Sequence, residues 1–282
     1  MRIVPWNRAD LNQVDTLPVA IMSLPDQITR RERLKSRGLP IDWVENFWPA
    51  TDFRSARAED LNRIVNLDEY ASFTGEPFRA AVVGCATTHH NLAKWLASTN
   101  FPMLFVLEDD VIPAVRDLAD RIIWAAGRLE ALATGGDAFI CHLGVRPEQL
   151  DQSLRRPVNS SSPENNEGRL WLHVDPRPTI WRAHAYLITR AAAMRTLDRE
   201  TRLLSVADDW IRRRNLGLID EIYVAEPRIF TQDELIPSTL GTPPISIPQP
   251  MQEVRYKNIF ASIKFRIKMR LARHQHMKPI SI

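Results

Sequence analysis

The segment Phe101-Pro-Met-Leu-Phe-Val-Leu-Glu108-Asp109-Asp110-Val-Ile-Pro113 runs from an apolar stretch straight into three carboxylates. A short, unbroken apolar run predicts a central strand that is buried on both faces, as in a parallel sheet. Ligands of open α/β sheets bind at the carboxyl ends of such strands. The segment therefore predicts an α/β fold that delivers acidic side chains to a ligand site.

The three carboxylates suggest a metal site. Side chains alternate along an extended backbone, so Glu108 and Asp110 are expected on one side and Asp109 on the other. Carboxylate oxygens suit Mn²⁺ or Mg²⁺, which bind carboxylates together with substrate phosphates. The alternative is that these acids cap the next helix or lie in a solvated turn. The tripeptide alone leaves both interpretations open.

The composition is that of an ordinary globular protein, with 282 residues, 44% of them apolar and 25% charged. No apolar run approaches the roughly 18 residues of a membrane span. The N-terminus lacks the apolar core of a signal peptide, so we expect a cytoplasmic protein. Cys85 and Cys141 lie far apart and predict neither a disulfide framework nor a zinc site. We expect both to be buried thiols.

The net charge of +3 hides an asymmetry along the chain. Residues 251–282 contain eight basic residues and one acid, a net +7, and the rest of the chain carries −4. A proline-rich linker, residues 237–250, precedes this tail. Apolar residues recur at helical spacing over 255–273, which favours a basic amphipathic helix on an anionic membrane surface. A helix docked on the body and a nucleic-acid arm are alternatives, but the tail has little aromatic interleaving for base stacking. We therefore expect no nucleic-acid partner and a catalytic body of residues 1–236.

The remaining patterns alternate between strands and helices. Strands are predicted at residues 18–24, 44–50, 137–144, 170–174, 183–189 and 222–230, and helices at residues 26–37, 86–97, 115–132, 191–197 and 208–215. Arg30 and Arg31 belong to a basic run in the first helix. Such a run can face a diphosphate or form a solvated helix face.

Three further residues are candidates for proton transfer. Gly84 is expected to break the chain before the helix at residues 86–97, which places His89 near a helix start. His89 can then donate to a substrate oxygen or act as a base, or it can be a packed histidine. Asp208 and Asp209 begin a short helix, where an N-cap with a first-turn acid explains them adequately. The functional alternative is a general base.

Taken in order, these landmarks resemble glycosyltransferase family 25, the lipooligosaccharide-type galactosyltransferases. The resemblance runs from about residue 18 to 240 and rests on Ala20-Ile-Met-Ser-Leu24 with Arg30-Arg31, Gly84-Cys85-Ala-Thr-Thr88-His89, Val106-Leu-Glu108-Asp109-Asp110-Val111, and Ala185-Tyr186-Leu-Ile-Thr-Arg190 followed by Val206-Ala-Asp208. These segments are similar to the family's "INL" strand with paired arginines, its "GC..SH" segment, its "LEDD" metal site, and its "AYLI" strand with the aspartate beyond it. Ser23 departs from the usual asparagine, Thr88 from the usual serine, and Asp209 directly follows Asp208.

The resemblance implies a GT-A-like, Rossmann-type nucleotide-sugar-binding domain. It implies inverting transfer of a hexose, most often galactose, from a UDP-sugar to a hydroxyl of a growing lipopolysaccharide, lipooligosaccharide or other glycan. On this basis Glu108 and Asp110 are expected to hold Mn²⁺ or Mg²⁺, and Arg30, Arg31 and Asp109 to bind the donor. Asp208 or Asp209 is the expected base, with His89 in reserve.

A glycolipid acceptor would place the enzyme on the inner face of the cytoplasmic membrane, held there by the basic tail. Two other functions remain open from the residues alone. One is a metal-dependent phosphohydrolase, and the other is a non-catalytic membrane-surface binding protein.

Overall fold

The computed structural model describes residues 1–10, 15–65, 79–133, 136–145, 155–157, 168–174, 180, 182–200, 202–203 and 205–236. Residues 1–240 form one compact unit. The predicted linker at 237–250 and the predicted amphipathic tail at 251–282 lie outside the described residues, so both stay predictions. Within the described residues, no helix combines the length and apolar character needed to cross a bilayer.

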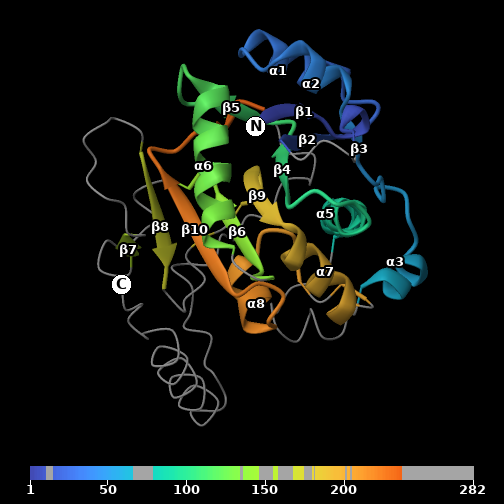
Figure 1. The fold of residues 1–282 in the computed structure, drawn as a ribbon. Helices are drawn as coiled ribbons and strands as arrows, with labels where there is room; N and C mark the ends of the chain where they lie inside the picture. Colours follow the sequence, from blue (N-terminus) through green and yellow to red (C-terminus); the bar gives the residue numbers. More distant parts are fainter. Residues whose placement is uncertain are drawn as a thin grey trace, which may run out of the picture. The chain divides into compact units, whose positions relative to one another are not determined.

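The described part of the chain is built on a mixed sheet of nine strands (Figure 1). Its order is β1-β2-β4-β9-β6-β10-β8-β7, with β3 paired to β2. The strands are β1 (Arg2–Pro5), β2 (Thr16–Ser23), β3 (Trp48–Pro49), β4 (Met103–Glu108), β6 (Phe139–His142), β7 (Arg155–Pro157), β8 (Arg169–His173), β9 (Ala185–Thr189) and β10 (Glu221–Glu226). A separate two-stranded sheet pairs β5 (Val111–Pro113) with β11 (Phe230–Gln232).

Strand β4 lies inside the sheet, as the sequence predicts, but only one of its two neighbouring strands is parallel to it. It pairs in parallel with β2 and antiparallel with β9. Strand β9 also pairs antiparallel with β6, and β6 pairs in parallel with β10. The α/β class is therefore confirmed, with a mixed sheet that is compatible with a Rossmann-like fold.

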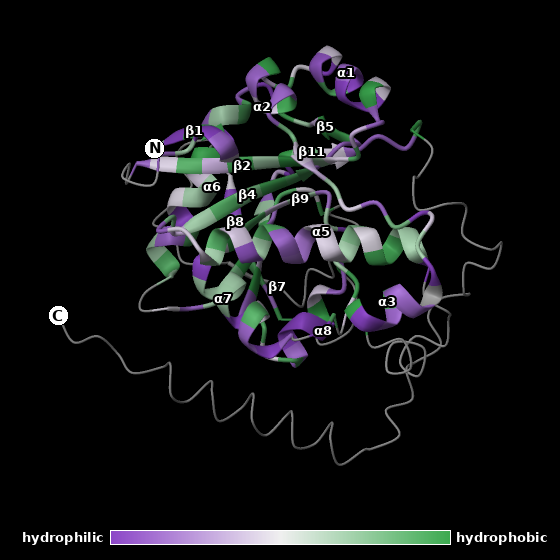
Figure 2. Cartoon of the chain, turned by 90° about the vertical axis from the view of Figure 1, so that its right-hand side faces the viewer, coloured by the Kyte–Doolittle hydropathy of each residue, from purple (hydrophilic) through white to green (hydrophobic). Residues whose placement is uncertain are grey.

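Helices cover both faces of the sheet. They are α1 (Ile28–Ser36), α2 (Ile41–Glu45), α3 (Ala58–Ile64), α5 (Ala80–Ala97), α6 (Leu118–Leu132), α7 (Arg190–Arg199) and α8 (Trp210–Asn215), with a 3₁₀ turn η1 (Trp6–Arg8). Met103, Phe105 and Leu107 of β4 pack in a cluster with residues of α2 and α6. Leu104 and Val106 pack with residues of α5, α7 and α8. The alternation of side chains along β4 thus fills two separate cores, and β4 carries hydrophobic colours in Figure 2.

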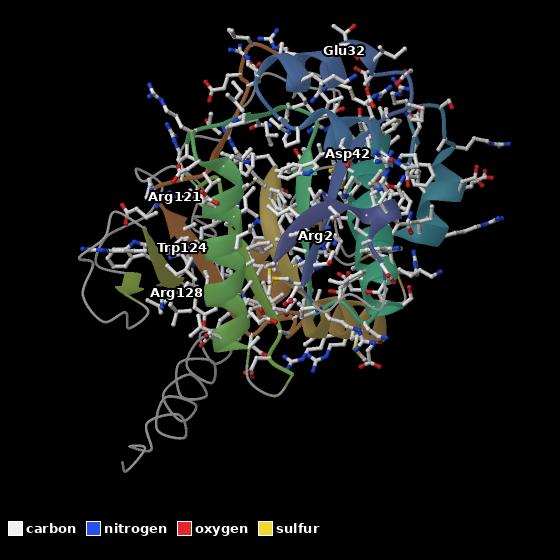
Figure 3. All side chains as sticks on the ribbon, turned by 45° about the horizontal axis from the view of Figure 1, so that its top comes forward. Arg2, Glu32, Asp42, Arg121, Trp124 and Arg128 are labelled. Carbon is white, nitrogen blue, oxygen red and sulfur yellow. The ribbon has the colours of Figure 1, made fainter. Side chains whose placement is uncertain are left out.

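Helix α6 shows the amphipathic pattern that the sequence predicts. Its buried residues Ile122, Ala125, Ala126 and Leu129 follow helical spacing and face the sheet. Arg121, Trp124 and Arg128 lie along a different side of the same helix (Figure 3). Burial of each large apolar chain stabilises the fold by about 1.5–3 kcal/mol, which holds α6 against the sheet.

The predicted strand at residues 44–50 is wrong in its first half. Residues Ile41–Glu45 form α2, which follows Pro40, and the strand is limited to Trp48–Pro49. Trp43 and Val44 are buried because one helical turn points both into the core. A short apolar run fits a helical turn and a strand equally well, and packing decides between them.

The predicted start of the helix at residues 86–97 is also wrong. Helix α5 begins at Ala80, and Gly84 lies inside it. A Cβ atom at position 84 would lie 2.6 Å from the carbonyl oxygen of Thr51, so glycine allows α5 to touch the segment that passes over it. Thr88 and His89 therefore lie in mid-helix, and the expected helix N-terminus at these residues does not exist.

The other predicted elements are present with shifted ends. The strands at residues 18–24, 137–144, 170–174 and 183–189 correspond to β2, β6, β8 and β9, and the helices at residues 26–37, 115–132, 191–197 and 208–215 correspond to α1, α6, α7 and α8. The predicted strand at residues 222–230 is divided into β10 and β11. The sequence did not predict β1, which pairs with the first half of β2.

Candidate active site

A cleft of about 120 Å³ opens where β2 and β4 end. Its floor comes from Glu108, Asp109 and Asp110 at the end of β4 and from Ser23 at the end of β2. Helix α1 contributes Arg30, and α5 contributes Cys85 and Thr88. Residues 50–54, here called the strap, form a wall, and Gln232 of β11 completes the lining. We refer to this feature as the acidic cleft.

Asp109 and Asp110 share one buried arginine. Arg30 Nη2 lies 2.7 Å from Asp109 Oδ1 and 3.3 Å from Asp110 Oδ2, and Arg30 is only 8% exposed. Ser23 Oγ donates to Asp109 Oδ2 at 2.7 Å, and Gln232 Nε2 donates to Asp110 Oδ2 at 2.9 Å. Asp109 therefore does not point away from Asp110, because both residues lie in the turn after β4, where strand alternation has ended.

Glu108 faces the other way, toward α5. Its Oε1 lies 3.4 Å from His89 Nε2. Burial raises the pKa of Glu108 well above its usual range, and the nearby carboxylates Asp110 and Asp208 raise it further. Burial also raises the pKa of Asp109, against the opposing effects of Arg30 and Ser23. The raised pKa values reflect the cost of charging these carboxyl groups in a buried site that has one arginine, Arg30, paired with two of them.

Asp110 has one carboxylate oxygen that could meet a cation. Asp110 Oδ1 is buried and accepts no hydrogen bond within the described residues, while Oδ2 is held by Arg30 and Gln232. A buried carboxylate oxygen without a partner is costly unless a cation meets it. A shared Mn²⁺ or Mg²⁺ at Glu108 and Asp110 stays a prediction, because Glu108 is turned toward His89 and not toward Asp110.

The two aspartates at the start of α8 differ in their surroundings. Asp209 is the N-cap of α8, and its side chain accepts a hydrogen bond from Arg212 N at 3.0 Å. Asp208 instead accepts from Arg182 N at 3.1 Å and acts electrostatically on Glu108. Burial raises the pKa of Asp208. The capping interpretation thus applies to Asp209, whereas Asp208 does not line the acidic cleft but raises the pKa of Glu108, which does.

His89 is a buried, neutral imidazole. It is 5% exposed, and its Nδ1 lies 2.7 Å from Tyr186 Oη. Burial, and secondarily the Arg213 charge, lowers the pKa of His89 to about 3. Its Nε2 is buried, points toward Glu108 and makes no hydrogen bond within the described residues. The packed-histidine interpretation therefore accounts for only one of the two ring nitrogens.

Two arginines near the cleft, Arg31 and Arg54, bond to other groups of the protein. Arg31 donates to the carbonyl oxygens of Leu24 and Pro25 at 2.7 and 2.9 Å, and its guanidinium stacks 4.0 Å from the Phe47 ring centre. Arg54 of the strap pairs with Asp26 and Asp52 at 2.8 and 2.6 Å. A donor-binding role for Arg30 and Arg31 stays a prediction, because in this structure both bond to the protein.

Sequence reasoning missed three contributors to the site. Cys85 precedes His89 by four residues, which would have indicated a shared helix face had α5 been placed correctly. Arg54 and Gln232 carry no such signal, because only the folded chain brings the strap and β11 to the carboxylates.

Comparison with protein-family models and with curated proteins finds no match for this chain. The resemblance to glycosyltransferase family 25 therefore stays an expectation from the motifs.

Proposed function

We propose that this protein is a metal-dependent inverting glycosyltransferase with a GT-A-like domain. It transfers a hexose, in the first instance galactose, from a UDP-sugar to a hydroxyl of a growing lipopolysaccharide or related glycan. The observation that carries the proposal is the acidic cleft itself. Three carboxylic residues line it at the end of a central strand, where α/β sheets bind ligands, and Arg30 pairs with two of them.

The residues of the cleft have distinct roles in this proposal. Glu108 and Asp110 would hold Mn²⁺ or Mg²⁺, which when bound offsets the negative charge of a diphosphate leaving group. Arg30 orients Asp109 and Asp110 by its two ion pairs. Ser23 donates to Asp109 Oδ2, and Gln232 donates to Asp110 Oδ2, the oxygen that Arg30 also contacts. A fixed set of carboxylates avoids reorganisation when the leaving group departs.

Asp208 is the proposed general base. A single in-line displacement requires a group that takes the proton of the acceptor hydroxyl as that oxygen attacks the anomeric carbon. Burial raises the pKa of Asp208, which makes it a better proton acceptor than an exposed aspartate, and its position is held by Arg182 N. Asp209 is committed to capping α8, and His89 is neutral and occupied by Tyr186 at Nδ1.

A donor screen tests the proposal. The full chain is incubated with UDP-galactose, UDP-glucose and UDP-N-acetylglucosamine, with Mn²⁺ or with EDTA, and with a lipooligosaccharide-type acceptor. We expect metal-dependent transfer from one donor, which is lost in Asp110→Asn. Asp120→Asn is the matched control, because Asp120 is an exposed acid on α6. If folded protein with Mn²⁺ releases no nucleotide and transfers no sugar from any donor, the proposal is wrong.

The same screen separates the alternatives. A phosphohydrolase would cleave the diphosphate without an acceptor and without preference for the sugar. A membrane-surface binding protein would show no turnover, and deletion of residues 251–282 would abolish its vesicle binding. A glycosyltransferase without that tail should still act on a soluble acceptor.

A further inference from the structure

We propose that Cys85, His89 and Glu108 form a binding site for a thiophilic divalent cation of the zinc class. This site is distinct from the hard-cation site of Glu108 and Asp110, although both use Glu108. It does not depend on the proposed transferase activity. The donor atoms of the three residues lie within 4.8 Å of one another.

The local fold brings the three ligands together. Cys85 and His89 are four residues apart on α5, so their side chains lie on the same face of the helix. Glu108 ends β4, and α5 packs on that strand through Leu92, Leu96, Leu104 and Val106. A thiolate, an imidazole and a carboxylate are all ligands that zinc accepts, and three protein ligands leave a fourth position open. Cys85 and Glu108 line the acidic cleft, so the open position can face it.

The distance between His89 and Glu108 already suits a shared metal. Zinc–nitrogen and zinc–oxygen bonds of about 2.0–2.2 Å at a tetrahedral angle place the two donor atoms about 3.3–3.5 Å apart. The His89 Nε2 to Glu108 Oε1 distance is 3.4 Å, yet this contact does not have the geometry of a hydrogen bond, and Nε2 is otherwise without a partner in the described structure. The Cys85 thiol lies within 4.8 Å of both donor atoms.

Tyr186 provides the outer contact that zinc-binding histidines usually have. Its hydroxyl lies 2.7 Å from His89 Nδ1. A hydrogen bond from Nδ1–H to the phenol oxygen places the lone pair on Nε2, the nitrogen that faces Glu108 and Cys85. Tyr186 is itself 3% exposed and stacks beside the imidazole at 5.6 Å, which fixes the ring plane. Tyr186 is thus a positioning residue for the proposed ligand.

Cobalt binding tests this site without any need for turnover. Metal-free protein is titrated with Co²⁺, which takes tetrahedral zinc sites and gives a near-ultraviolet band when a thiolate binds it. We expect this band in the wild type and in Asp110→Asn, and we expect it to disappear in Cys85→Ser. Cys141→Ala is the matched control and should keep the band, since Cys141 is the only other cysteine and is fully buried in β6. Tyr186→Phe should weaken cobalt affinity about 10–100-fold.

Two results of the cobalt titration would overturn the proposal. One is cobalt bound without a thiolate band, which would assign the ion to the carboxylates alone. The other is a band that survives in Cys85→Ser. If Cys85→Ser fails to fold, alkylation of Cys141→Ala replaces it, because Cys85 is then the sole thiol. Zinc should slow that alkylation at least about tenfold, and no protection would contradict the site. Absence of sugar transfer leaves all of these readouts unchanged, so the two proposals fail separately.

Discussion

Ser23 Oγ donates a hydrogen bond to Asp109 Oδ2 over 2.7 Å and so joins the ends of β2 and β4. The same hydroxyl accepts from Arg31 Nη1 at 3.1 Å. Ser23 is 2% exposed and Asp109 is 8% exposed, so water cannot easily replace either partner. The floor of the acidic cleft is therefore formed by the ends of two strands, through a contact between residues 86 positions apart in the sequence.

Replacement of Ser23 should therefore destabilise the fold. In Ser23→Ala, Asp109 loses a donor in a buried position, and the free energy of unfolding should fall by about 1–3 kcal/mol. Ser36→Ala removes an exposed hydroxyl from α1 and should change stability by less than about 0.5 kcal/mol. Urea denaturation of both variants measures the difference. Equal stabilities would show that the Ser23 bond contributes nothing.

Removal of the Arg30 charge should be more costly. Arg30→Leu leaves Asp109 and Asp110 buried without their shared cation, and breaking such a buried pair costs about 3–5 kcal/mol. Divalent cations should stabilise this variant more than the wild type, because they supply the lost positive charge. Thermal unfolding with Mn²⁺ and with EDTA tests this. Arg8→Leu breaks the exposed pair with Asp42 and should cost no more than about 1 kcal/mol. An identical Mn²⁺ effect on wild type and Arg30→Leu would argue against a cation at these carboxylates.

Asparagine substitutions separate Asp208 from Asp209. Asparagine caps helices about as well as aspartate, so Asp209→Asn should keep both stability and activity. Asp208→Asn removes the proposed base and should lower the transfer rate about 10²–10⁴-fold while the protein stays folded. Initial rates with saturating donor, together with circular dichroism, make the comparison. The roles are reversed if Asp209→Asn is the inactive variant.

His142 should make stability depend on pH. Its Nδ1 accepts from Gly144 N at 3.0 Å, and its Nε2 donates to Arg182 O at 2.7 Å, so the ring is held neutral. Burial lowers the pKa of His142 to about 4, from 6.5 in an unfolded chain. The unfolded state therefore binds the proton first, and the stabilisation present above pH 6.5 is lost as pH falls toward 4.

Between pH 7 and pH 5 this loss is about 2 kcal/mol relative to a residue that does not titrate. His142→Gln should be less stable at pH 7 but should lose less stability on acidification. Urea unfolding of both proteins at the two pH values gives the difference. Parallel pH profiles would contradict a neutral His142.

Glycine replacements test the close approach of α5 to the strap. Gly84→Ala should destabilise the protein, because the new Cβ meets the Thr51 carbonyl oxygen at 2.6 Å. Gly127 lies in α6, and a Cβ added there would meet no neighbouring group within 4 Å, so Gly127→Ala should stabilise by about 0.5–1 kcal/mol. Melting temperatures of the two variants should therefore shift in opposite directions. A rise in the melting temperature of both variants would show that the strap can move away from α5 to make room for the new Cβ.

The sequence predicts the parts of the molecule that depend on local pattern. The apolar run of β4 and the spacing of α6 are strong periodic signals, and the carboxylates after β4 indicate the site. The start of α5 was not predicted, because a glycine in sequence usually indicates the end of a helix. Gly84 is instead inside α5, where the absence of a side chain allows a close contact with Thr51. Asp208 and Asp209 could not be separated, since both suit a helix start and only the folded chain brings Arg182 N to Asp208. The pairing of Arg30 with Asp109 likewise depends on how α1 is placed beside β4.

The strap is anchored by its backbone and presents its side chains to the cleft. Ala50 N donates to Ser23 O at 2.9 Å, and Thr51 N donates to Thr88 Oγ1 at 2.8 Å. Asp52 and Arg54 are exposed and pair mainly with each other and with Asp26. Asp52 and Arg54 can therefore diverge without disturbing the carboxylates on the floor. Evolution, or a mutant library, can therefore change which ligands this cleft admits while the carboxylates on its floor stay the same.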